Sequence, residues 1–305
     1  MLNFLTHLPS IFISSVSQGF LWSFLAVGVY ITFRLLDIPD MTTEGSFPLG
    51  GAIVSILILQ GASPVISTSL AVLGGMLAGL ITGLLHTKLK IPALLAGIIT
   101  MTGLYSINSR IMANSATLSL IQQPTVFSWF EKILKQPHLS IIILGGMLLL
   151  ILLPLLYLFF QTEIGLAIIA TGDNLTMSQA NGINTNSTQL LGYMLANGLI
   201  ALSGALLTQQ KGFSDLNAGI GTIVIGLASI IVAEVLFKQK PLLTRLFTIV
   251  LGTVVYRLIL AFILELPIQA NDNKFFSALF LAGCLCLPLL QQQEKKLKKG
   301  VTYHG

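Results

Sequence analysis

Charged side chains are scarce in this sequence. Asp, Glu, Lys and Arg make up only 9% of its 305 residues, whereas an ordinary soluble domain carries about 25%. Hydrophobic residues make up 54%, and the mean hydropathy is +0.88. Apolar stretches of roughly 18 or more residues recur along the whole length. The sequence therefore excludes an ordinary soluble protein. It predicts an all-α integral membrane protein, a polytopic helical bundle in which residues 1–305 form one transmembrane domain.

Residues that commonly carry chemistry are also few. The four histidines lie in loops, at span ends or in the tail, without the spacing of a metal site. The two cysteines, Cys284 and Cys286, would point to different faces of a helix, which indicates packing or lipid contact. The sequence contains no Gly-x-x-x-x-Gly-Lys-Ser/Thr loop for nucleotide phosphates, and Ser203 has no histidine at membrane depth to act as its base. We expect no metal site, no bound cofactor and no enzymatic activity in this chain by itself.

Nine apolar segments are candidate membrane spans. They are residues 11–36, 46–60, 63–86, 91–111, 138–160, 187–209, 217–237, 244–265 and 273–290. The second is short and follows the polar stretch 37–48, which contains Pro and Gly, and the seventh opens with the Gly-rich stretch 217–222. Irregular backbone at membrane depth persists only where it is buried in protein or lines a watery cavity.

Paired broken spans in two halves of a chain indicate a transport path, although glycines can also serve close helix packing. We therefore predict a translocation path at the broken second and seventh spans and at polar residues of the neighbouring spans. Its predicted residues are Glu44, Ser46, Phe47, Asn108, Asn197, Asn217 and Thr222. For Asn108 and Asn197, hydrogen bonding between helices is the alternative interpretation.

The basic residues predict the orientation. The net charge of +5 does not indicate nucleic-acid binding, because the basic residues form short clusters between the apolar segments. One alternating set of loops holds Arg34, Lys88, Lys90, Lys238, Lys240, Arg245, Lys295, Lys296, Lys298 and Lys299, and the other holds Arg110, Lys132, Lys135, Lys211 and Lys274. Cytoplasmic loops carry the excess of Lys and Arg. This rule places the first set and the basic tail 291–305 in the cytoplasm and the N-terminus outside. We expect no removable signal peptide, because the first ten residues lack a basic n-region.

Two ionisable residues fall inside predicted spans, where they are costly in lipid. Glu234 lies near the cytoplasmic end of the seventh span, and Lys238 one turn later is its expected partner. Arg257 lies deeper in the eighth span, and Glu265 is poorly placed on the helix to reach it. Pairing of Arg257 with another span and exposure to a cavity both stay open.

A polar segment at residues 163–186 separates the fifth and sixth spans and would lie in the cytoplasm. A simple connection between helices could be far shorter. Its middle, from Asp173 to Ala180, has a helical pattern that a capping Thr-Gly-Asp-Asn sequence opens and Asn181-Gly182 closes. A short capped helix exposed to water is suited to docking another protein.

Two motifs carry a resemblance to a known family. Glu163-x-Gly165-Leu-Ala-x-x-Ala-Thr-Gly-Asp-Asn174 resembles the cytoplasmic coupling segment of ABC-importer permeases of the branched-chain amino acid and ribose class. Asp37-Ile-Pro-Asp-Met-Thr-Thr-Glu-Gly-Ser-Phe-Pro-Leu-Gly-Gly-Ala52 resembles a second signature of one subfamily, linked to tryptophan, tyrosine or related amino acids and to a lipoprotein-type binding protein in Firmicutes and relatives. One departure is Ile168-Ile169, where relatives commonly carry a basic residue.

The resemblance implies a division of labour between subunits. This chain would form a homodimeric pore in a bacterial plasma membrane, with two ATP-binding subunits that hold ATP and Mg²⁺ on the cytoplasmic face. An extracellular solute-binding lipoprotein would deliver a small solute, and we expect an aromatic or other hydrophobic amino acid. The residues expected to contact the ATP-binding subunit are Thr171, Gly172, Asp173, Asn174, Met177, Ala180, Gly182 and Asn184. Two alternatives stay open: an autonomous secondary carrier of a small neutral solute, driven by protons or sodium, and a scaffold subunit.

Overall fold

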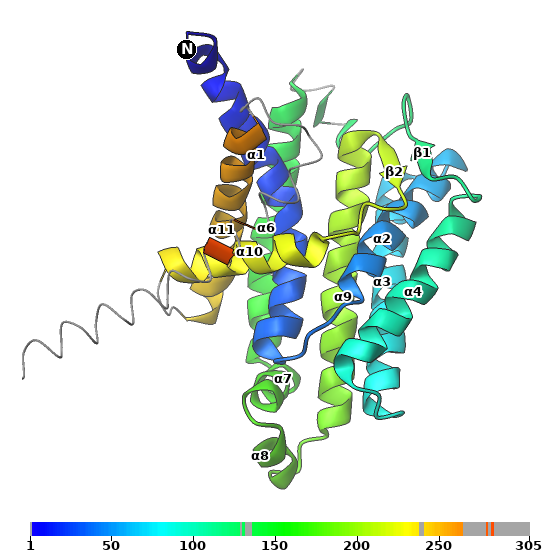
Figure 1. The fold of residues 1–305 in the computed structure, drawn as a ribbon, viewed down its shortest axis with the longest axis vertical. Coiled ribbons are helices and arrows are strands. Elements are labelled where there is room, and N and C mark those ends of the chain that lie inside the picture. Colours follow the sequence, from blue (N-terminus) through cyan, green and yellow to red (C-terminus); the bar gives the residue numbers. More distant parts are fainter. Residues whose placement is uncertain are drawn as a thin grey trace, which may run out of the picture.

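The protein is a bundle of helices that run mostly along one axis (Figure 1). The computed structural model describes residues 2–128, 130–131, 136–237, 241–264, 279 and 282–283. Its helices are α1 (Leu2–Tyr30), α2 (Thr43–Leu59), α3 (Pro64–Thr87), α4 (Ala93–Ile111), α6 (Pro137–Gln161), α7 (Glu163–Asp173), α8 (Leu175–Ala180), α9 (Thr185–Lys211), α10 (Thr222–Leu236) and α11 (Leu242–Leu264). A π-helical turn, η1 (Ile31–Leu35), continues α1.

The helical membrane fold agrees with the sequence analysis, but the count of nine spans is not confirmed. Among the described residues, five helices are long and apolar enough to cross a membrane, and α2 and α10 are shorter apolar helices. Helix α4 does not join them, because Thr, Ser, Tyr, Asn and Arg residues fill its second half. The predicted span 273–290, apart from three of its residues, and the tail 291–305 lie outside the described residues.

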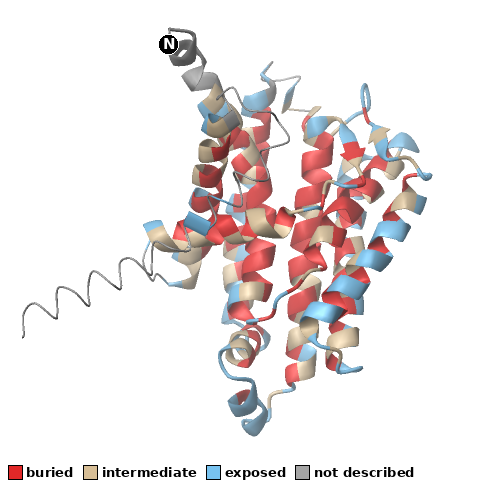
Figure 2. Cartoon of the chain, viewed as in Figure 1, coloured by how far each residue is buried: buried red, intermediate tan, exposed pale blue. Residues whose placement is uncertain are grey.

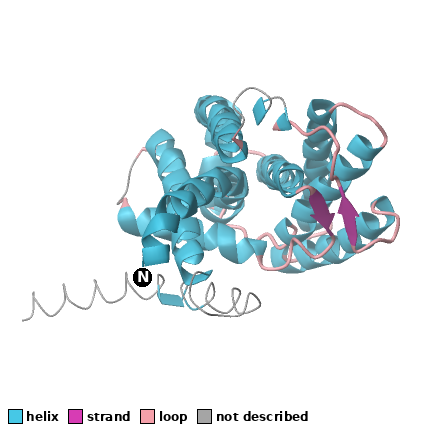
Figure 3. Cartoon of the chain, turned by 90° about the horizontal axis from the view of Figure 1, so that it is seen from above, coloured by secondary structure: helices cyan, strands magenta, loops and turns pink. Residues whose placement is uncertain are grey.

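A small sheet departs from the all-α prediction. Strands β1 (Thr117–Ser119) and β2 (Phe213–Asp215) pair antiparallel, with Leu118 opposite Ser214. They follow α4 and α9 respectively, so they join the ends of these two helices. Seen down the long axis, the strands lie to one side of the molecule (Figure 3).

Helix α9 is the central helix of the bundle and is buried along most of its length (Figure 2). It packs against α1, α2 and α3. Small residues allow the close approach to α2, because a side chain at Gly50 would overlap the carbonyl oxygen of Ala201, and one at Gly204 would overlap that of Phe47. Small residues at helix interfaces are typical of membrane bundles, where apolar contact with lipid is no worse than apolar contact with protein.

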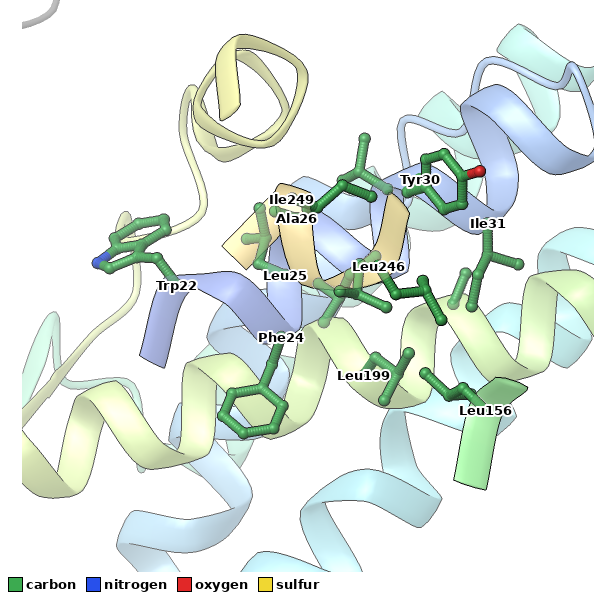
Figure 4. Packing of buried hydrophobic residues seen from close by; sticks show 14 of the residues in the cluster. Trp22, Phe24, Leu25, Ala26, Tyr30, Ile31, Leu156, Leu199, Leu246 and Ile249 are labelled. Atoms are coloured by element: carbon green, nitrogen blue, oxygen red, sulfur yellow. The ribbon is translucent and has the colours of Figure 1, made fainter. Parts of the chain in front are cut away.

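The largest apolar core forms around the second half of α1 (Figure 4). Leu25 of α1 and Ile31 of η1 are buried there beside Leu246 of α11, Leu199 of α9 and Leu156 of α6. This core ties the end of α1 to three other helices. Packing in this core therefore fixes the position of η1, which follows α1 directly.

Helix α10 runs across the direction of its neighbours (Figure 1). The seventh span was predicted to begin at residue 217, but the helix begins at Thr222, after a turn in which Gly221 has a φ of +82°. Gly226 lets α10 pass close over Leu25 and Val29 of α1. The prediction of a broken start is therefore correct, whereas the prediction of a span along the bundle axis is not supported.

The two ends of the bundle differ. The end of α1, the connection between α3 and α4 and the α7–α8 pair share the lower end of Figure 1, whereas the chain start and both strands lie at the upper end. Arg34, Lys88 and Lys90 therefore lie at the same end as the segment 163–186, as the orientation prediction requires.

Candidate functional site

A buried polar network holds the start of α2 against α9. Both carboxylate oxygens of Asp40 accept hydrogen bonds, Oδ1 from the backbone N–H of Thr42 at 2.9 Å and Oδ2 from Nδ2 of Asn197 at 2.8 Å. The Ser46 hydroxyl donates to Oδ1 of Asn197 at 2.7 Å. The Thr42 hydroxyl lies 2.7 Å from that of Thr82 on α3. The network thus joins the broken stretch before α2 to two other helices.

The surroundings of Asp40 act on the charge of its carboxyl group in two opposite directions. Its side chain is 2% exposed, and a buried carboxylate is costly unless it is well hydrogen-bonded. It lies just before the first turn of α2, where the backbone N–H groups carry a partial positive charge. No ion pair joins Asp40 to a basic side chain within the described residues. Burial raises the pKa of Asp40 above its ordinary value, and the hydrogen bonds from Thr42 and Asn197 offset this rise only in part.

The starts of α2 and α10 meet directly. Oε1 of Glu44, in the first turn of α2, accepts a hydrogen bond from the N–H of Gly221 at 2.9 Å, and Gly221 is the N-cap residue of α10. The Glu44 carbonyl lacks its helical donor, because Pro48 has no N–H. Gly219 packs against this carbonyl so closely that a side chain there would overlap it. The two broken helices predicted from the sequence thus converge at one place.

A pocket of about 360 Å³ opens beside this junction. Its walls come from the first turns of α2, the second half of α4 and the turn before α10. The lining residues are Glu44, Gly45, Pro48, Met101, Thr102, Tyr105, Ser106, Asn108, Leu216, Asn217, Gly219 and Ile220. Small-molecule sites in proteins are typically pockets of roughly 300–1,000 Å³ with mostly apolar walls and a few polar groups. This pocket has that character.

The structure brings the residues of the predicted path together in two layers. Glu44, Asn108 and Asn217 line the pocket. Ser46, Phe47, Asn197 and Thr222 are buried and line no part of it. Asp40 and Tyr105 are not among the residues predicted for this path from the sequence. The spacing of Thr102, Ser106 and Ser109 on one face of α4 would have indicated a polar surface there.

Phe47 belongs to a stack of two aromatic rings, and an arginine side chain lies on the second ring. Its ring stacks on that of Trp22 at a centroid distance of 5.2 Å. On Trp22 lies the guanidinium of Arg257, whose Cζ is 4.1 Å from the ring centroid. This cation–π contact is the favourable environment that the sequence did not identify for Arg257. Glu265 lies outside the described residues.

The segment 163–186 consists of two short helices rather than one. The helix predicted from Asp173 to Ala180 begins at Leu175, and Asp173 is the last residue of α7. The break occurs at Asn174, whose extended backbone frees its side chain to accept the N–H of Met177 at 3.0 Å and so cap α8. Gly182, with a φ of +80°, follows the end of α8 as predicted.

Helix α8 exposes an apolar surface on a polar segment. Leu175 is 42% exposed and Met177 is 63% exposed. Ser178 faces the other way, and its hydroxyl donates to the carbonyl of Ala170 on α7 at 2.8 Å. The other exposed residues of the predicted contact set are Asp173, Asn174, Ala180, Gly182 and Asn184. Thr171 and Gly172 instead face the bundle: Thr171 is buried, with its hydroxyl 2.8 Å from that of Thr188.

Direct contacts link this segment to the junction of the broken helices. Gly172 of α7 lies so close to the Leu35 carbonyl of η1 that a side chain would overlap it. Arg34, also in η1, forms an ion pair with Glu234 in the last turn of α10. Lys238, the partner predicted for Glu234 from the sequence, lies outside the described residues. The other end of α10 is the Gly221–Glu44 contact, so α10 connects η1 with the pocket.

Comparisons with known proteins agree with one another. Residues 11–284 match the family described as the permease component of the branched-chain amino acid transport system. The tyrosine transport system permease protein of Clostridioides difficile is 41% identical over 284 residues, 93% of each chain. The autoinducer 2 import system permease protein LsrC of Yersinia pseudotuberculosis is 28% identical over 271 residues, 86% of this chain and 72% of LsrC. No solved structure matches.

Proposed function

Because this chain belongs to the family of branched-chain amino acid transport system permease components, we propose that it is the membrane-spanning subunit of an ATP-driven importer of an amino acid. A permease component of an ABC-type transport system is not itself an enzyme, which confirms that part of the sequence analysis. An aromatic or other hydrophobic amino acid is the proposed solute, in keeping with the tyrosine named for the C. difficile relative. In this proposal a bacterial plasma membrane holds the subunit, and an extracellular lipoprotein delivers the solute.

The observation that carries the proposal is the α7–α8 pair. It presents exposed Leu175 and Met177 to the outside of the bundle while Ser178 anchors it inward. An apolar contact surrounded by polar residues is typical of a protein interface. We assign this surface to an ATP-binding subunit, which would hold ATP and Mg²⁺, on the cytoplasmic side. The missing basic residue at Ile168-Ile169 restricts the proposed contact to residues 171–184.

The contacts of α10 suggest how motion reaches the pore. Closure of two ATP-binding subunits would move α7 and α8, and α7 packs directly on η1. The Arg34–Glu234 ion pair would pass this motion to α10, whose far end holds Glu44. The pocket would then change its shape as the subunit alternates between inward-open and outward-open states.

Exposed polar residues on α4 support a homodimer. Thr102, Tyr105 and Ser106 are exposed on the outside of the isolated subunit, and nothing lies within 4 Å of a side chain added at Gly103. Polar groups facing lipid are costly. We propose that this face of α4 meets its counterpart across the two-fold axis, so that the pocket opens onto the shared path.

A cross-linking experiment tests this face. With Cys284 and Cys286 replaced by serine, Gly103→Cys is expected to form a disulfide-linked dimer on mild oxidation of membranes. Leu150→Cys on α6 is the control, because this residue is 63% exposed on the most hydropathic span and is expected to face lipid. Equal cross-linking of the two variants, or none for Gly103→Cys, would contradict the proposed face.

Copurification tests the function itself. The purified chain is expected to hydrolyse no ATP, whereas an ATP-binding subunit encoded beside it and co-expressed with it is expected to copurify and to hydrolyse ATP. Family membership argues against the alternative of an autonomous secondary carrier. Absence of both partner genes from the neighbourhood, together with failure to retain any ATP-binding subunit, would count against the importer.

A further inference from the structure

We infer that the carboxylate of Glu44 binds the ammonium group of the solute inside the pocket between α2, α4 and the turn before α10. The inference rests on the proposed function and adds to it the part of the solute that the permease itself recognises. It assigns the pocket to an amine or zwitterion with an apolar body, such as an aromatic amino acid.

The walls of the pocket carry a negative charge. Glu44 is the only residue that lines the pocket and is charged at neutral pH, among the residues that the structure describes. The ends of two helices that would attract an anion are already occupied by protein carboxylates. Asp40 lies at the start of α2, and Glu44 accepts from the N-cap residue of α10. The pocket therefore attracts a cationic group and repels a solute with net negative charge.

The Glu44 carboxylate is held in place and can still accept a further hydrogen bond. The Gly221 N–H binds Oε1, which orients the carboxylate at the junction of the two helices. No ion pair involves Glu44 within the part of the chain described. A carboxylate accepts several hydrogen bonds, so Oε2 can receive an ammonium N–H without loss of the Gly221 contact.

Asn108, on the α4 wall of the pocket, has an unused acceptor. Its side chain is fully buried, and Nδ2 donates to the carbonyl of Gly45 at 3.2 Å. Its Oδ1 has no hydrogen-bond partner among the described residues. Buried polar atoms in proteins almost always have a partner. This unpartnered acceptor belongs to a residue that lines the same pocket as Glu44.

The remaining walls suit an apolar side chain. Pro48, Met101 and Leu216 line the pocket, and the ring of Tyr105 offers a surface for stacking. No lysine or arginine among the described residues lines it. The pocket thus holds the acceptors of Glu44 and Asn108 and an apolar wall. These suit the ammonium group and the apolar side chain of a hydrophobic amino acid.

The test compares Glu44→Gln with wild type in the complete complex, reconstituted with the ATP-binding subunit and the binding protein. The glutamine keeps an oxygen for the Gly221 N–H but removes the charge. Since hydrogen bonds to charged groups contribute more than neutral ones, tyrosine uptake at saturating binding protein is expected to fall roughly 10- to 100-fold. The thermal unfolding midpoint is expected to stay unchanged. Glu131→Gln, an exposed carboxylate far from the pocket in sequence, is the matched control.

A second measurement uses the membrane complex without the binding protein. Binding of radiolabelled tyramine, which keeps the ammonium group, is expected to weaken by a similar factor in Glu44→Gln, whereas the deamino analogue of tyrosine is expected to lose nothing. If the Glu44→Gln complex takes up tyrosine as fast as the wild-type complex, the inference is overturned. Equal losses in Glu131→Gln, or a lowered unfolding midpoint in Glu44→Gln, would also overturn it. A wild-type complex that takes up no amino acid would instead overturn the proposed function.

Discussion

Replacing Asp40 with asparagine is expected to destabilise the subunit by about 1–3 kcal/mol, because one N–H donor of the buried network then faces an NH₂ group instead of an oxygen. Asp40 accepts from both Thr42 and Asn197, and asparagine offers only one acceptor. The start of α2 would lose one of the hydrogen bonds that hold it in place. We therefore expect a lower thermal unfolding midpoint of the purified protein and little or no uptake.

Asp37→Asn is the matched control for this variant. It makes the same chemical change three residues earlier in the same stretch, but Asp37 is exposed. Its unfolding midpoint is expected to equal that of wild type. If Asp40→Asn also unfolds at the wild-type temperature, the carboxylate is not the acceptor that the network requires, and the account of the α2–α9 junction is wrong.

The combined change Asp173→Lys and Met177→Asp is expected to abolish both copurification of the ATP-binding subunit and uptake. Met177 is the most exposed apolar residue of α8, and a buried unpaired aspartate at an interface opposes docking. Asp173 lies beside it at the end of α7, where the change reverses the charge. Copurification from membranes measures the first effect and uptake measures the second.

The double variant is expected to fold, because both side chains are exposed. Met177 is also not part of the main apolar core of the described residues. Gln123→Asp, in an exposed turn at the opposite end of the bundle, is the control and should leave copurification intact. Wild-type amounts of copurified ATP-binding subunit with the double variant would show that docking occurs elsewhere.

Local patterns predicted the local structure well. Asn181-Gly182 ended α8 where the sequence suggested, and Asn174 capped its start, although Asp173 belongs to α7 and α8 begins only at Leu175. The Pro- and Gly-rich stretches broke the helices that follow them. Such features depend on a few neighbouring residues. They can therefore be inferred without knowledge of the fold.

Contacts between distant residues could not be predicted in this way. Asp40 and Asn197 are 157 positions apart, and Arg34 and Glu234 are 200 apart. The direction of α10 depends on Gly226 passing over α1, and a single sequence cannot distinguish this apolar helix from a span. The pocket was predicted only as a set of separate polar residues, because its shape arises where three elements meet.

Uptake of tyrosine into proteoliposomes tests the central claim most directly. The vesicles contain this subunit and its ATP-binding partner, with the binding protein outside and either ATP inside or an imposed proton or sodium gradient. The account predicts uptake that requires internal ATP and the ATP-binding subunit and is indifferent to both gradients. Uptake by this chain alone, driven by either gradient without ATP, would contradict it.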